Sequence, residues 1–380
     1  MKWRALLYVQ HLLGIGHLVR TSRIAAALAQ GPFTVTVVSG GMPAPGVDFG
    51  AARLVQLPPA RADASGFATL LDADGAPFAP NALARRAALL LRHFDSAQPH
   101  ALLLEAFPFA RRQMRFELLP LLERARAATP RPLIGSSVRD ILQESRKPGR
   151  AQETAALVET DFDYVLVHGD RKSTPLDASF PLARRFRDKI VYTGLVGPPP
   201  GGAAINTHDV IVSAGGGAVG VGLIRCALEA RPLTTLRDLK WLALAGPNMP
   251  EAAMAEFVAL SGGRVTLERF VTQLPQRLAG AALSVSQAGY NTVAEILGAG
   301  CRSVLVPFAA HGESEQTTRA QSLAQRGLAV CVGEAGLTPQ RLALAIEFAL
   351  ALPPPAAQGR QDGAAATCAF LERALAARFG

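Results

Sequence analysis

The sequence predicts an α/β protein made of two doubly wound domains, each with a parallel sheet between layers of helices. Apolar segments of strand length alternate with helical segments along the 380-residue chain, which is the pattern of a parallel sheet covered on both faces. A Gly/Pro-rich segment from Gly194 to Ala204 interrupts this alternation and is typical of a linker. Each half opens with a strand followed by a Gly-rich loop, so two domains of similar design are expected.

The expected domain boundaries follow this linker and a second break near the end of the chain. Consecutive prolines from Pro353 to Pro355 end the second α/β series, because proline continues neither a helix nor a sheet ladder. A last helix is expected from Ala364 to Ala377. The predicted division is residues 1–198 for the first domain, 199–207 for the linker, 208–352 for the second domain and 353–380 for the C-terminal helical segment.

The individual elements are predicted from the hydrophobic pattern. Residues 33–39, which read FTVTVVS, are rich in β-branched side chains and are typical of a strand. The other strands expected in the first domain are at residues 3–10, 53–57, 101–105, 133–137, 164–168 and 190–193, with helices at 18–30, 81–94, 111–128 and 152–160. Residues 61–80 are polar and rich in Gly and Pro, so a mobile surface loop is expected there. The strands expected in the second domain are at residues 209–213, 240–244, 265–268, 283–286, 303–307 and 329–332.

The net charge of +9 is unevenly distributed. The excess of Lys and Arg over Asp and Glu lies almost entirely in residues 1–200. A basic first domain suits an anionic acceptor or the anionic face of a membrane, and a solvated Arg-rich surface is an equal alternative. No basic motif with interleaved aromatic residues and no zinc module favours nucleic acid.

Cysteine usage and the absence of long apolar runs favour the cytoplasm. The four cysteines are far apart and show no CxxC spacing, so reduced core thiols are expected rather than disulfides or a metal site. No apolar run reaches membrane-spanning length, and residues 3–10 are too short for a signal peptide. We therefore expect a cytoplasmic protein without a metal, with peripheral contact at the inner membrane face as an open alternative.

The most informative stretch covers residues 283–326. A short apolar strand leads into a turn around Gly289, and Asn291 and Thr292 stand where a helix N-cap is expected, with Glu295 one turn later. A second strand and a polar loop then lead into another helix. Helix N-termini at the carboxyl edge of a parallel sheet offer N–H groups and the positive end of a dipole, so this edge is expected to bind phosphate and sugar hydroxyl groups.

Another Gly-rich loop opens the second domain, directly after the strand at residues 209–213. The residues expected to approach a ligand there are Ser213, Gly215, Gly216 and Gly217. Glycine leaves room for a diphosphate next to the backbone N–H groups. The loop lacks the Lys-Ser/Thr pair of a P-loop and does not match the GxGxxG fingerprint with its acidic residue, so NAD is disfavoured.

The order of these residues resembles the nucleotide-sugar signature of MurG-type glycosyltransferases of family 28, which have the GT-B fold of two Rossmann-like domains facing across a cleft. The residues that carry the resemblance are Gly289, Asn291, Thr292 and Glu295, then Pro307 and Phe308, then Glu315 and Gln316. It covers the C-terminal half well, whereas the first half matches in architecture and in one loop. The resemblance also implies that the last helix packs back on the first domain.

The resemblance implies a UDP-sugar site. The turn at Gly289 would lie against the diphosphate, Glu295 would hold the ribose hydroxyl groups, and residues 315–316 would hold the donor sugar. Phe270 would contact the uracil, and a place in the core is the alternative for its side chain. The implied nucleotide-sugar-binding residues are Gly16, Ser213, Gly215, Gly216, Gly217, Phe270, Gln287, Gly289, Asn291, Thr292, Glu295, Glu315 and Gln316.

The loop at residues 14–20 carries a Gly-x-Gly-His pattern at an expected helix N-terminus. It looks like the loop in which GT-B enzymes hold a general base, which implies that role for His17, with mere packing of the loop as the alternative. The helix N-terminus should keep the imidazole neutral. Glu105 would orient His17 in a place where Asp is usual, and a structural carboxylate is the alternative. The residues expected at the acceptor site are Arg20, Ser136, Ser137 and Arg139.

The expected activity is inverting, metal-independent transfer of a sugar from a UDP-hexose or UDP-N-acetylhexosamine, without a cofactor, to a hydroxyl group or similar nucleophile of an unidentified acceptor, for which an anionic or lipid-linked molecule is one candidate. A UDP-sugar hydrolase is the alternative, because the Gly-His-x-x-Arg run from Gly16 to Arg20 also resembles the UDP-sugar hydrolase of pseudaminic acid synthesis. A UDP-sugar epimerase, which shares the fold, is a third class. The sugar, the acceptor and the oligomeric state are not determined by the sequence.

Overall fold

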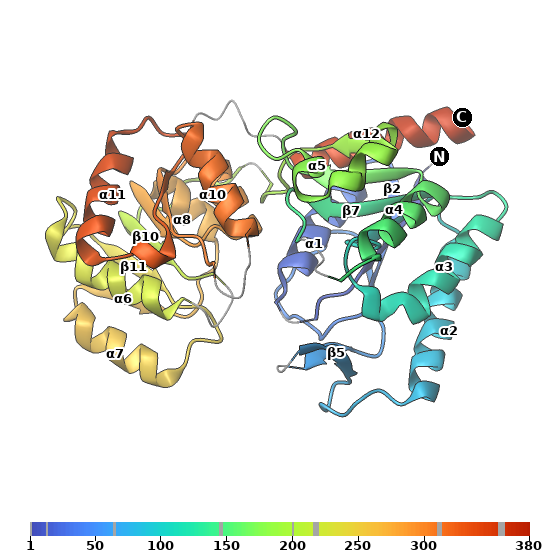
Figure 1. Ribbon diagram of the computed structural model, residues 1–380, viewed down its shortest axis with the longest axis horizontal. Helices are drawn as coiled ribbons and strands as arrows, with labels where there is room; N and C mark the ends of the chain where they lie inside the picture. Colours follow the sequence, from blue (N-terminus) through green and yellow to red (C-terminus); the bar gives the residue numbers. More distant parts are fainter. Residues whose placement is uncertain are drawn as a thin grey trace. The chain divides into compact units, whose positions relative to one another are not determined.

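The computed structural model consists of two compact units. It describes residues 2–12, 14–63, 66–143, 147–199, 201–215, 220–309, 314–355 and 362–380, without the side chains of residues 66–68. Unit 1 comprises Met1–Val196 together with Gln361–Gly380, and unit 2 comprises Gly197–Arg360 (Figure 1). The chain therefore leaves unit 1 once and returns to it with its last helix.

Unit 1 is built on a parallel sheet with the strand order β3-β2-β1-β6-β7-β8-β9. Its strands are β1 (Trp3–Val9), β2 (Phe33–Ser39), β3 (Arg53–Gln56), β6 (Ala101–Glu105), β7 (Leu133–Arg139), β8 (Tyr164–His168) and β9 (Ile190–Tyr192). The direction of the strand order reverses between β1 and β6. This reversal is a topological switch point, the place where open α/β sheets bind ligands at the carboxyl ends of their strands.

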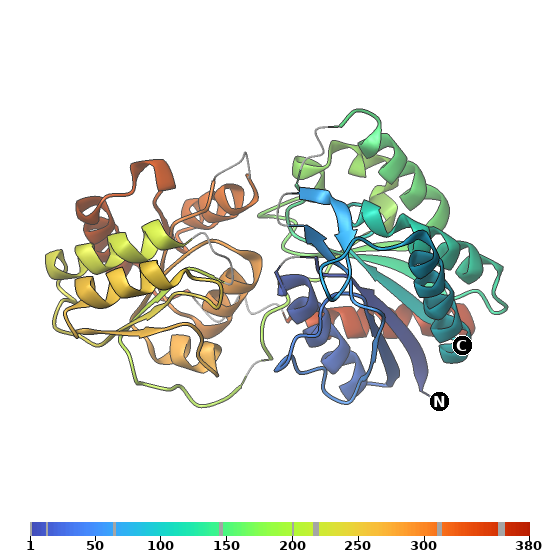
Figure 2. The same cartoon turned by 90° about the horizontal axis from the view of Figure 1, so that it is seen from below.

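Helices cover both faces of this sheet. They are α1 (Gly16–Gln30), α2 (Pro80–Ala97), α3 (Arg115–Ala127), α4 (Arg150–Asp161), α5 (Leu176–Ser179) and α12 (Gly363–Phe379), with the 3-10 helices η1 (Arg112–Met114) and η2 (Pro181–Lys189). Leu28 of α1 and Leu375 of α12 pack into the core on one face, whereas Phe94 of α2 and Leu122 of α3 pack into the core on the other. Because α12 lies against α1 (Figure 2), the end of the chain completes the core of the unit in which the chain began.

Unit 2 repeats this design with the strand order β12-β11-β10-β13-β14-β15 and a switch point between β10 and β13. Its strands are β10 (Val210–Ser213), β11 (Trp241–Leu244), β12 (Val265–Glu268), β13 (Leu283–Ser286), β14 (Ser303–Leu305) and β15 (Val330–Cys331). Its helices are α6 (Val221–Ala230), α7 (Glu251–Ser261), α8 (Leu274–Gly280), α9 (Tyr290–Ala299), α10 (Glu315–Gln325) and α11 (Pro339–Ala351), with η3 (Arg231–Leu233) and η5 (Glu334–Gly336). Side chains of α6, α7 and α11 form one core with the sheet. Right-handed crossovers place α9 and α10 on the opposite face, because they follow strands beyond the switch point.

Two strands lie between residues 61 and 71, where a loop was predicted for residues 61–80, and residues 72–79 are irregular as predicted. β4 (Arg61–Asp63) and β5 (Gly66–Leu71) pair antiparallel as a hairpin. The backbone N–H of Ala62 donates a hydrogen bond of 3.0 Å to the carbonyl oxygen of Leu12, so the hairpin is tied to the loop that follows β1. The prediction was wrong because this contact joins segments far apart in the sequence, and local composition carries no signal for it.

Among the element boundaries in unit 1 that differ from the prediction, three bear on the candidate site. α1 begins at Gly16 rather than at residue 18, so His17 lies in its first turn. β7 continues to Arg139, beyond its predicted end at residue 137. The helix predicted at residues 111–128 is divided into η1 and α3, and Arg111 before η1 has a left-handed backbone with a φ of 63°.

Candidate active site

The residues predicted to carry chemistry in unit 1 gather at its switch point. β1 and β6 are neighbouring parallel strands, and the carboxyl ends of parallel strands meet at one edge of the sheet. The loop after β1 leads into α1 with His17 in its first turn, and Glu105 is the last residue of β6. The topology of the sheet therefore brings together two side chains that are 88 residues apart in the sequence.

His17 and Glu105 are in direct contact. Nδ1 of His17 lies 2.6 Å from Oε1 of Glu105, and the side chain of Glu105 is 2% exposed whereas that of His17 is 22% exposed. An ionised carboxylate only accepts hydrogen bonds, so Nδ1 of His17 is the donor and Nε2 carries no proton in the neutral ring. The arrangement presents a basic nitrogen on a partly exposed imidazole.

The surroundings favour a neutral imidazole beside an ionised carboxylate. Burial lowers the pKa of His17 to about 4, and Arg111 and Arg20 act in the same direction against the raising effect of Glu105. Burial by itself raises the pKa of Glu105, but His17, Arg20 and Arg111 outweigh it and lower that pKa to about 2. The neutral His17 expected from the sequence therefore has burial as its main cause, whereas the sequence analysis attributed it to the helix N-terminus.

Arg20 lies inside the unit rather than at an acceptor-binding surface. Its side chain is 2% exposed, and its guanidinium group pairs with Oε1 of Glu105, the same oxygen atom that contacts His17. Residues three positions apart share one face of a helix, so α1 presents both His17 and Arg20 to the carboxylate. The predicted contact of Arg20 with an acceptor does not agree with this burial.

The serines predicted at the acceptor site are also covered. Ser136 and Ser137 lie within β7 and are buried, because the strand continues past them to Arg139. Oγ of Ser137 lies 2.7 Å from Nε2 of His168, whose Nδ1 lies 2.7 Å from Oγ1 of Thr193. Of the predicted acceptor residues, Arg139 alone is partly exposed.

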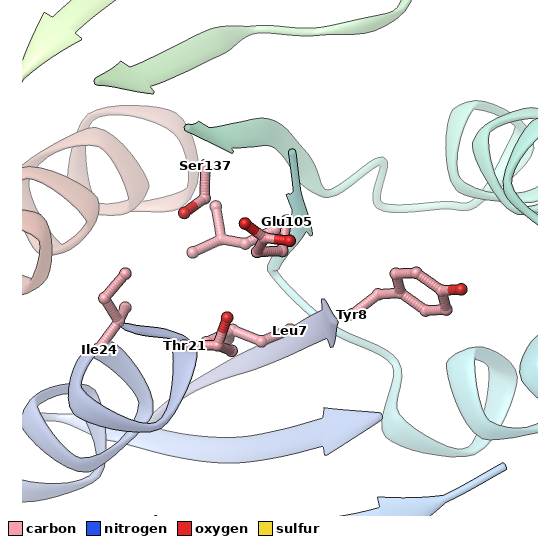
Figure 3. A pocket seen from close by; sticks show the side chains of 7 residues that line it. Leu7, Tyr8, Thr21, Ile24, Glu105 and Ser137 are labelled. Atoms are coloured by element: carbon pink, nitrogen blue, oxygen red, sulfur yellow. The ribbon is translucent and has the colours of Figure 1, made fainter. Parts of the chain in front are cut away.

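A small cavity of about 10 Å³ borders Glu105 (Figure 3). Its walls include Thr21 and Ser137 together with apolar side chains such as Leu7 and Ile24. In Figure 3 Ser137 and Thr21 lie on either side of Glu105. A space of this size accommodates about one water molecule.

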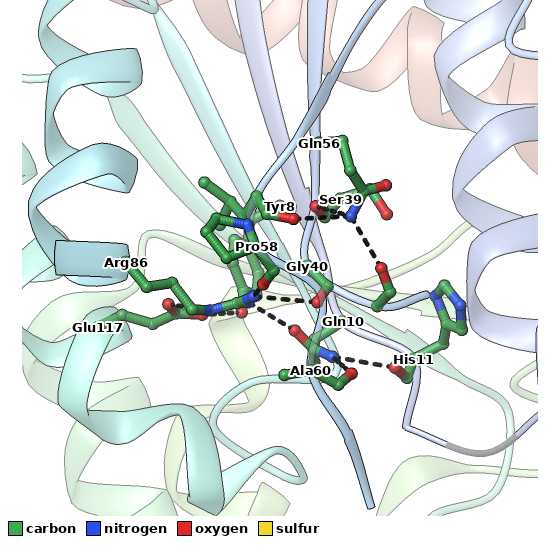
Figure 4. Close-up of polar contacts among 12 residues, drawn as sticks. Tyr8, Gln10, His11, Ser39, Gly40, Gln56, Pro58, Ala60, Arg86 and Glu117 are labelled. Carbon is green, nitrogen blue, oxygen red and sulfur yellow. Dashed lines mark hydrogen bonds and ion pairs between the residues drawn. The ribbon is translucent and has the colours of Figure 1, made fainter. Parts of the chain in front are cut away.

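A second buried polar network, which the sequence analysis missed, supports the same edge. Arg86 of α2 and Glu117 of α3 are fully buried, and Nε of Arg86 donates to Oε2 of Glu117 at 2.8 Å. Arg86 also donates to Oε1 of Gln10 at 2.8 Å and to the carbonyl oxygen of Gly40 at 3.1 Å, and the hydroxyl of Tyr8 donates to Glu117 (Figure 4). Buried charges need partners, so charged residues on the apolar faces of predicted helices are the signal that could have revealed this network.

The network holds the loops that follow three strands. Nε2 of Gln10 donates to the carbonyl oxygens of His11 and Ala60, both at 2.9 Å. A Cβ atom at Gly40 would come within 2.2 Å of both Arg86 and Gln10, so only glycine fits beside the guanidinium group. The loops after β1, β2 and β3 are therefore held together near the start of α1.

In unit 2, the predicted diphosphate-binding residues gather at the switch point between β10 and β13. Ser213 ends β10 and is buried, and the N–H of Gly215 donates to its Oγ at 3.4 Å. Gly215 has a φ of +71°, a left-handed conformation that glycine adopts without strain. Gln287 follows β13 and is buried. Gly216 and Gly217 lie outside the described residues.

The helix after β13 begins earlier than predicted. Gly289 is the N-cap of α9 and Tyr290 its first residue, so the prediction of Asn291 and Thr292 as N-cap residues was wrong, and both lie in the first turn. Backbone N–H groups of a first turn are the ones that a helix offers to an anion. Glu295, partly buried, lies one turn further along. The shifted boundary therefore keeps these residues at the anion-binding end of the helix.

Side chains of α10 hold this turn in place. Oε1 of Gln316 accepts hydrogen bonds from the backbone N–H groups of Ala288 at 3.0 Å and Phe308 at 3.2 Å. Arg319, which is buried, donates to the carbonyl oxygen of Ala288 at 2.8 Å and to Oε1 of Glu315 at 2.7 Å. The side-chain amide oxygen of Gln316 is thus used within the protein. The sequence analysis did not single out Arg319.

The last two predicted residues, Phe270 and Gly16, lie in different units. Phe270 follows β12 and is 74% exposed, so it is not the core residue that the sequence left open. Gly16 is the first residue of α1 and lies in unit 1 beside His17. The predicted residues therefore form two groups, with the base, its partner, Gly16 and the acceptor residues in unit 1 and the other donor residues in unit 2.

The arginines at and around η1 are paired within unit 1. Arg112 and Arg115 both form ion pairs with Glu153 of α4, and Nε of Arg111 donates to the carbonyl oxygen of Gln10 at 2.6 Å.

None of the helices in the described ranges is long and apolar enough to cross a bilayer. Within those ranges, no group of three or more His, Cys, Asp and Glu side chains could hold a metal ion. The four cysteines have free thiols.

Comparison with known proteins finds glycosyltransferases. Residues 210–367 match the family model of the glycosyltransferase family 28 C-terminal domain. Curated relatives are UDP-N-acetylglucosamine–N-acetylmuramyl-(pentapeptide) pyrophosphoryl-undecaprenol N-acetylglucosamine transferases. The one from Methylorubrum populi is 31% identical over 32% of this chain and 33% of its own, and the one from Rhodospirillum centenum is 32% identical over 44% of each. The matched region thus spans less than half the length of these relatives.

Solved structures resemble the chain over nearly its whole length. The MurG of Acinetobacter baumannii has a TM-score of 0.59 at 17% identity and covers 97% of this chain and 99% of its own. The calicheamicin glycosyltransferase CalG4 has a TM-score of 0.60 at 16% identity and covers 100% and 98%. The glycosyltransferase of kitacinnamycin has a TM-score of 0.65 at 15% identity and covers 99% and 100%. The chain therefore has the GT-B fold, and the predicted resemblance to MurG-like glycosyltransferases is confirmed.

Proposed function

We propose that the protein is a glycosyltransferase that moves a sugar from a UDP-sugar to an acceptor hydroxyl group with inversion at the anomeric carbon. Its relatives and structural neighbours are glycosyltransferases, and the curated relatives carry UDP-N-acetylglucosamine in their names. The observation that carries the proposal is the 2.6 Å contact between His17 and Glu105 at the switch point of unit 1.

In this proposal His17 is the general base. Its Nε2 takes the proton of the acceptor hydroxyl while that oxygen attacks the anomeric carbon, and the bond from this carbon to the diphosphate breaks on the opposite face of the sugar. Glu105 holds the Nδ1–H and stabilises the imidazolium that forms. With a pKa lowered to about 4, the imidazole is neutral at neutral pH and able to accept the proton.

Unit 2 is proposed to bind the donor. Backbone N–H groups of the loop after β10 and of the first turn of α9 would meet the diphosphate, and Glu295 would hold the ribose. The exposed ring of Phe270 would stack on the uracil. Glu315 and the amide group of Gln316 would contact the sugar. Helix N-termini also favour the negative charge of the leaving UDP, so the proposed reaction uses no metal ion and no other cofactor.

The proposed acceptor is anionic and lipid-linked. The first half of the chain carries most of the positive charge, and the names of the curated relatives include an undecaprenol pyrophosphoryl acceptor. Such an acceptor lies at a membrane surface, so we propose that the protein works in the cytoplasm with peripheral contact at the inner face of the membrane.

Nucleotide binding and turnover test the proposal. The unfolding temperature is measured without added metal in the presence of UDP, dTDP, GDP or NAD. UDP at about 100 times its dissociation constant should stabilise the protein by roughly 2.7 kcal/mol, and an unchanged unfolding temperature with every nucleotide would remove the UDP site. The His17→Ala variant should no longer release UDP from UDP-N-acetylglucosamine, but it should bind UDP as tightly as the wild type does. Full turnover in this variant would exclude His17 as the base.

A UDP-sugar hydrolase is the second candidate. The Gly-His-x-x-Arg run at the start of α1 favours it, because the sequence of this loop resembles that of such a hydrolase. His17 would then take a proton from water instead of an acceptor hydroxyl group. Equal amounts of free sugar and UDP, formed at full rate without any acceptor, would identify hydrolysis, whereas UDP release that depends on added acceptor would identify transfer.

A further inference from the structure

Two side chains of α1 converge on a single oxygen atom of Glu105. Nδ1 of His17 lies 2.6 Å from Oε1 of Glu105, and Nη2 of Arg20 pairs with the same oxygen. Arg20 and Glu105 are each 2% exposed, whereas His17 is 22% exposed. The proposed base therefore reaches the surface of unit 1, while the ion pair that holds it is closed off from solvent.

The other oxygen of this carboxylate has no hydrogen-bond donor in the part of the chain that the structure describes. Glu105 borders the cavity of about 10 Å³ that Thr21 and Ser137 also line (Figure 3), a space for about one water molecule. His17 and Arg20 are thus the described side chains that donate hydrogen bonds to Glu105. The charge state and the orientation of the carboxylate depend on these two.

We propose that Arg20 is a positioning residue for His17: it keeps the Glu105 carboxylate ionised, so that His17 donates from Nδ1 and presents an unprotonated Nε2. The inference rests on the proposed role of His17 as the general base. A buried carboxyl group without a cation favours its neutral form, and a protonated carboxyl group could donate to His17 and stabilise the opposite tautomer. An arginine stays protonated at every pH at which the protein is folded, so its charge at this site is permanent.

Other ionisable groups face the same carboxylate from neighbouring elements. They are Arg111 before η1, His11 after β1 and His168 in β8. Burial lowers the pKa of His11, and it lowers that of His168 to about 3, so both are neutral at neutral pH. Arg111 donates to the carbonyl oxygen of Gln10. Within the described residues, Arg20 is therefore the permanent cation in direct contact with Glu105.

A purely structural ion pair would behave differently from a positioning residue. Both roles predict a less stable unit 1 without Arg20, because Glu105 would be left as a buried charge without its cation. The positioning role alone links Arg20 to the tautomer of His17. Without the charge of Arg20 the Glu105 carboxyl group takes up a proton more readily, and it can then donate to Nδ1 of His17 and move the ring proton to Nε2.

The direct test is an NMR titration of His17 in the full-length protein with isotope-labelled histidine, in which His17→Ala assigns the signals. The wild type should show the Nδ1–H tautomer and a midpoint well below 6.5. Arg20→Met should show a larger share of the Nε2–H tautomer at neutral pH, and Arg20→Lys, which keeps the charge, should show the wild-type tautomer. An unchanged Nδ1–H tautomer in Arg20→Met would overturn the proposal. If Arg20→Met does not fold, the wild-type tautomer decides, and an Nε2–H form would overturn it.

UDP release from UDP-N-acetylglucosamine gives a second readout. In Arg20→Met kcat should fall while KM for the donor stays constant, because the Nε2–H tautomer cannot accept the acceptor proton and the proposed donor site lies in unit 2. Arg20→Lys, which keeps the charge, should recover kcat, and a kcat as low in Arg20→Lys as in Arg20→Met would reduce Arg20 to a structural role. Full turnover in His17→Ala would refute the proposed base itself and would leave the tautomer measurement as a separate result.

Discussion

The two units share one architecture but carry different atoms at their switch points. In unit 1 the edge between β1 and β6 is occupied by ionisable side chains, with His17 and Arg20 both in contact with Glu105. In unit 2 the edge between β10 and β13 is occupied by Gly-containing turns and the first turn of α9. Side chains that titrate suit proton transfer, whereas backbone N–H groups suit an anion of constant charge. Under the proposed roles, the same fold serves proton transfer in one unit and anion binding in the other, through the different atoms that each sheet edge presents.

A buried arginine lies near each of the two edges, and the two arginines contact different groups. Arg86 in unit 1 pairs with Glu117 and reaches the carbonyl oxygen of Gly40, so it joins helices to loops. Arg319 in unit 2 reaches the carbonyl oxygen of Ala288, directly before the proposed diphosphate turn. Changes in unit 1 should therefore alter turnover or stability without altering nucleotide affinity. Changes at the edge of unit 2 should alter nucleotide affinity.

The largest effect is expected for Glu105→Gln. The amide can donate to His17 and favour the wrong tautomer, so kcat should fall by roughly 10²–10⁴-fold, the range of general base catalysis. The affinity for UDP should not change, because the proposed nucleotide site lies in unit 2. UDP release and calorimetric titration with UDP measure the two quantities. A kcat near that of the wild type would show that Glu105 is only a structural carboxylate.

Arg86→Met should destabilise unit 1 by about 3–5 kcal/mol, because Glu117 would remain as a buried charge without its partner. The double variant Arg86→Met/Glu117→Leu removes both charges and should recover much of this loss. The chain has two tryptophans, Trp3 in unit 1 and Trp241 in unit 2, so urea unfolding followed in a Trp241→Phe background reports unit 1. A double variant no more stable than the single one would contradict this account.

Acid should destabilise unit 1 more than unit 2. The pKa values of His17 and His168 are lowered by burial to about 4 and about 3, below the ordinary 6.5 of an unfolded chain. Their contribution to stability is therefore present above pH 6.5 and is lost as the pH falls through the folded values, by roughly 2 kcal/mol for each at about pH 5. Urea midpoints from Trp3 and Trp241 at neutral and acid pH compare the units. An equal shift in both would disprove the difference.

Glu295→Ala should weaken UDP binding by about 10- to 100-fold, since a hydrogen bond to a charged group is worth about 1.5–3 kcal/mol. The matched control is UDP without its ribose hydroxyl groups. The wild type should discriminate against this analogue, and the variant should bind both nucleotides alike. Unchanged UDP affinity in the variant would remove Glu295 from the ribose site.

The smallest change in stability is expected for Phe270→Ala. The ring is 74% exposed, so its removal should change the free energy of unfolding by no more than about 0.5 kcal/mol. Loss of stacking on the base should weaken UDP binding by about 1–3 kcal/mol. Urea unfolding followed through Trp241 and titration with UDP separate the two effects. A large loss of stability with normal UDP affinity would assign Phe270 to packing instead.

Local pattern was sufficient for several strands. The predicted bounds of β2, β6, β8, β12 and β13 agree with the structure, because each is a short run rich in apolar or β-branched residues. The contact between His17 and Glu105, which the resemblance to GT-B enzymes implied, is present in the structure. The topology accounts for it, since the carboxyl ends of neighbouring parallel strands lie at one edge.

Tertiary structure alone decided which polar groups are covered and what they contact. Arg20 and Ser137 resemble surface residues in the sequence but are buried. The side-chain amide oxygen of Gln316 accepts hydrogen bonds from two backbone N–H groups. The hairpin after β3 and the pair of Arg86 and Glu117 depend on partners far away in the chain. The spacing of hydrophobic residues and the residue types of turns are local and can be read along the sequence. The burial of a side chain and its hydrogen-bond partners depend on which distant segment packs against it.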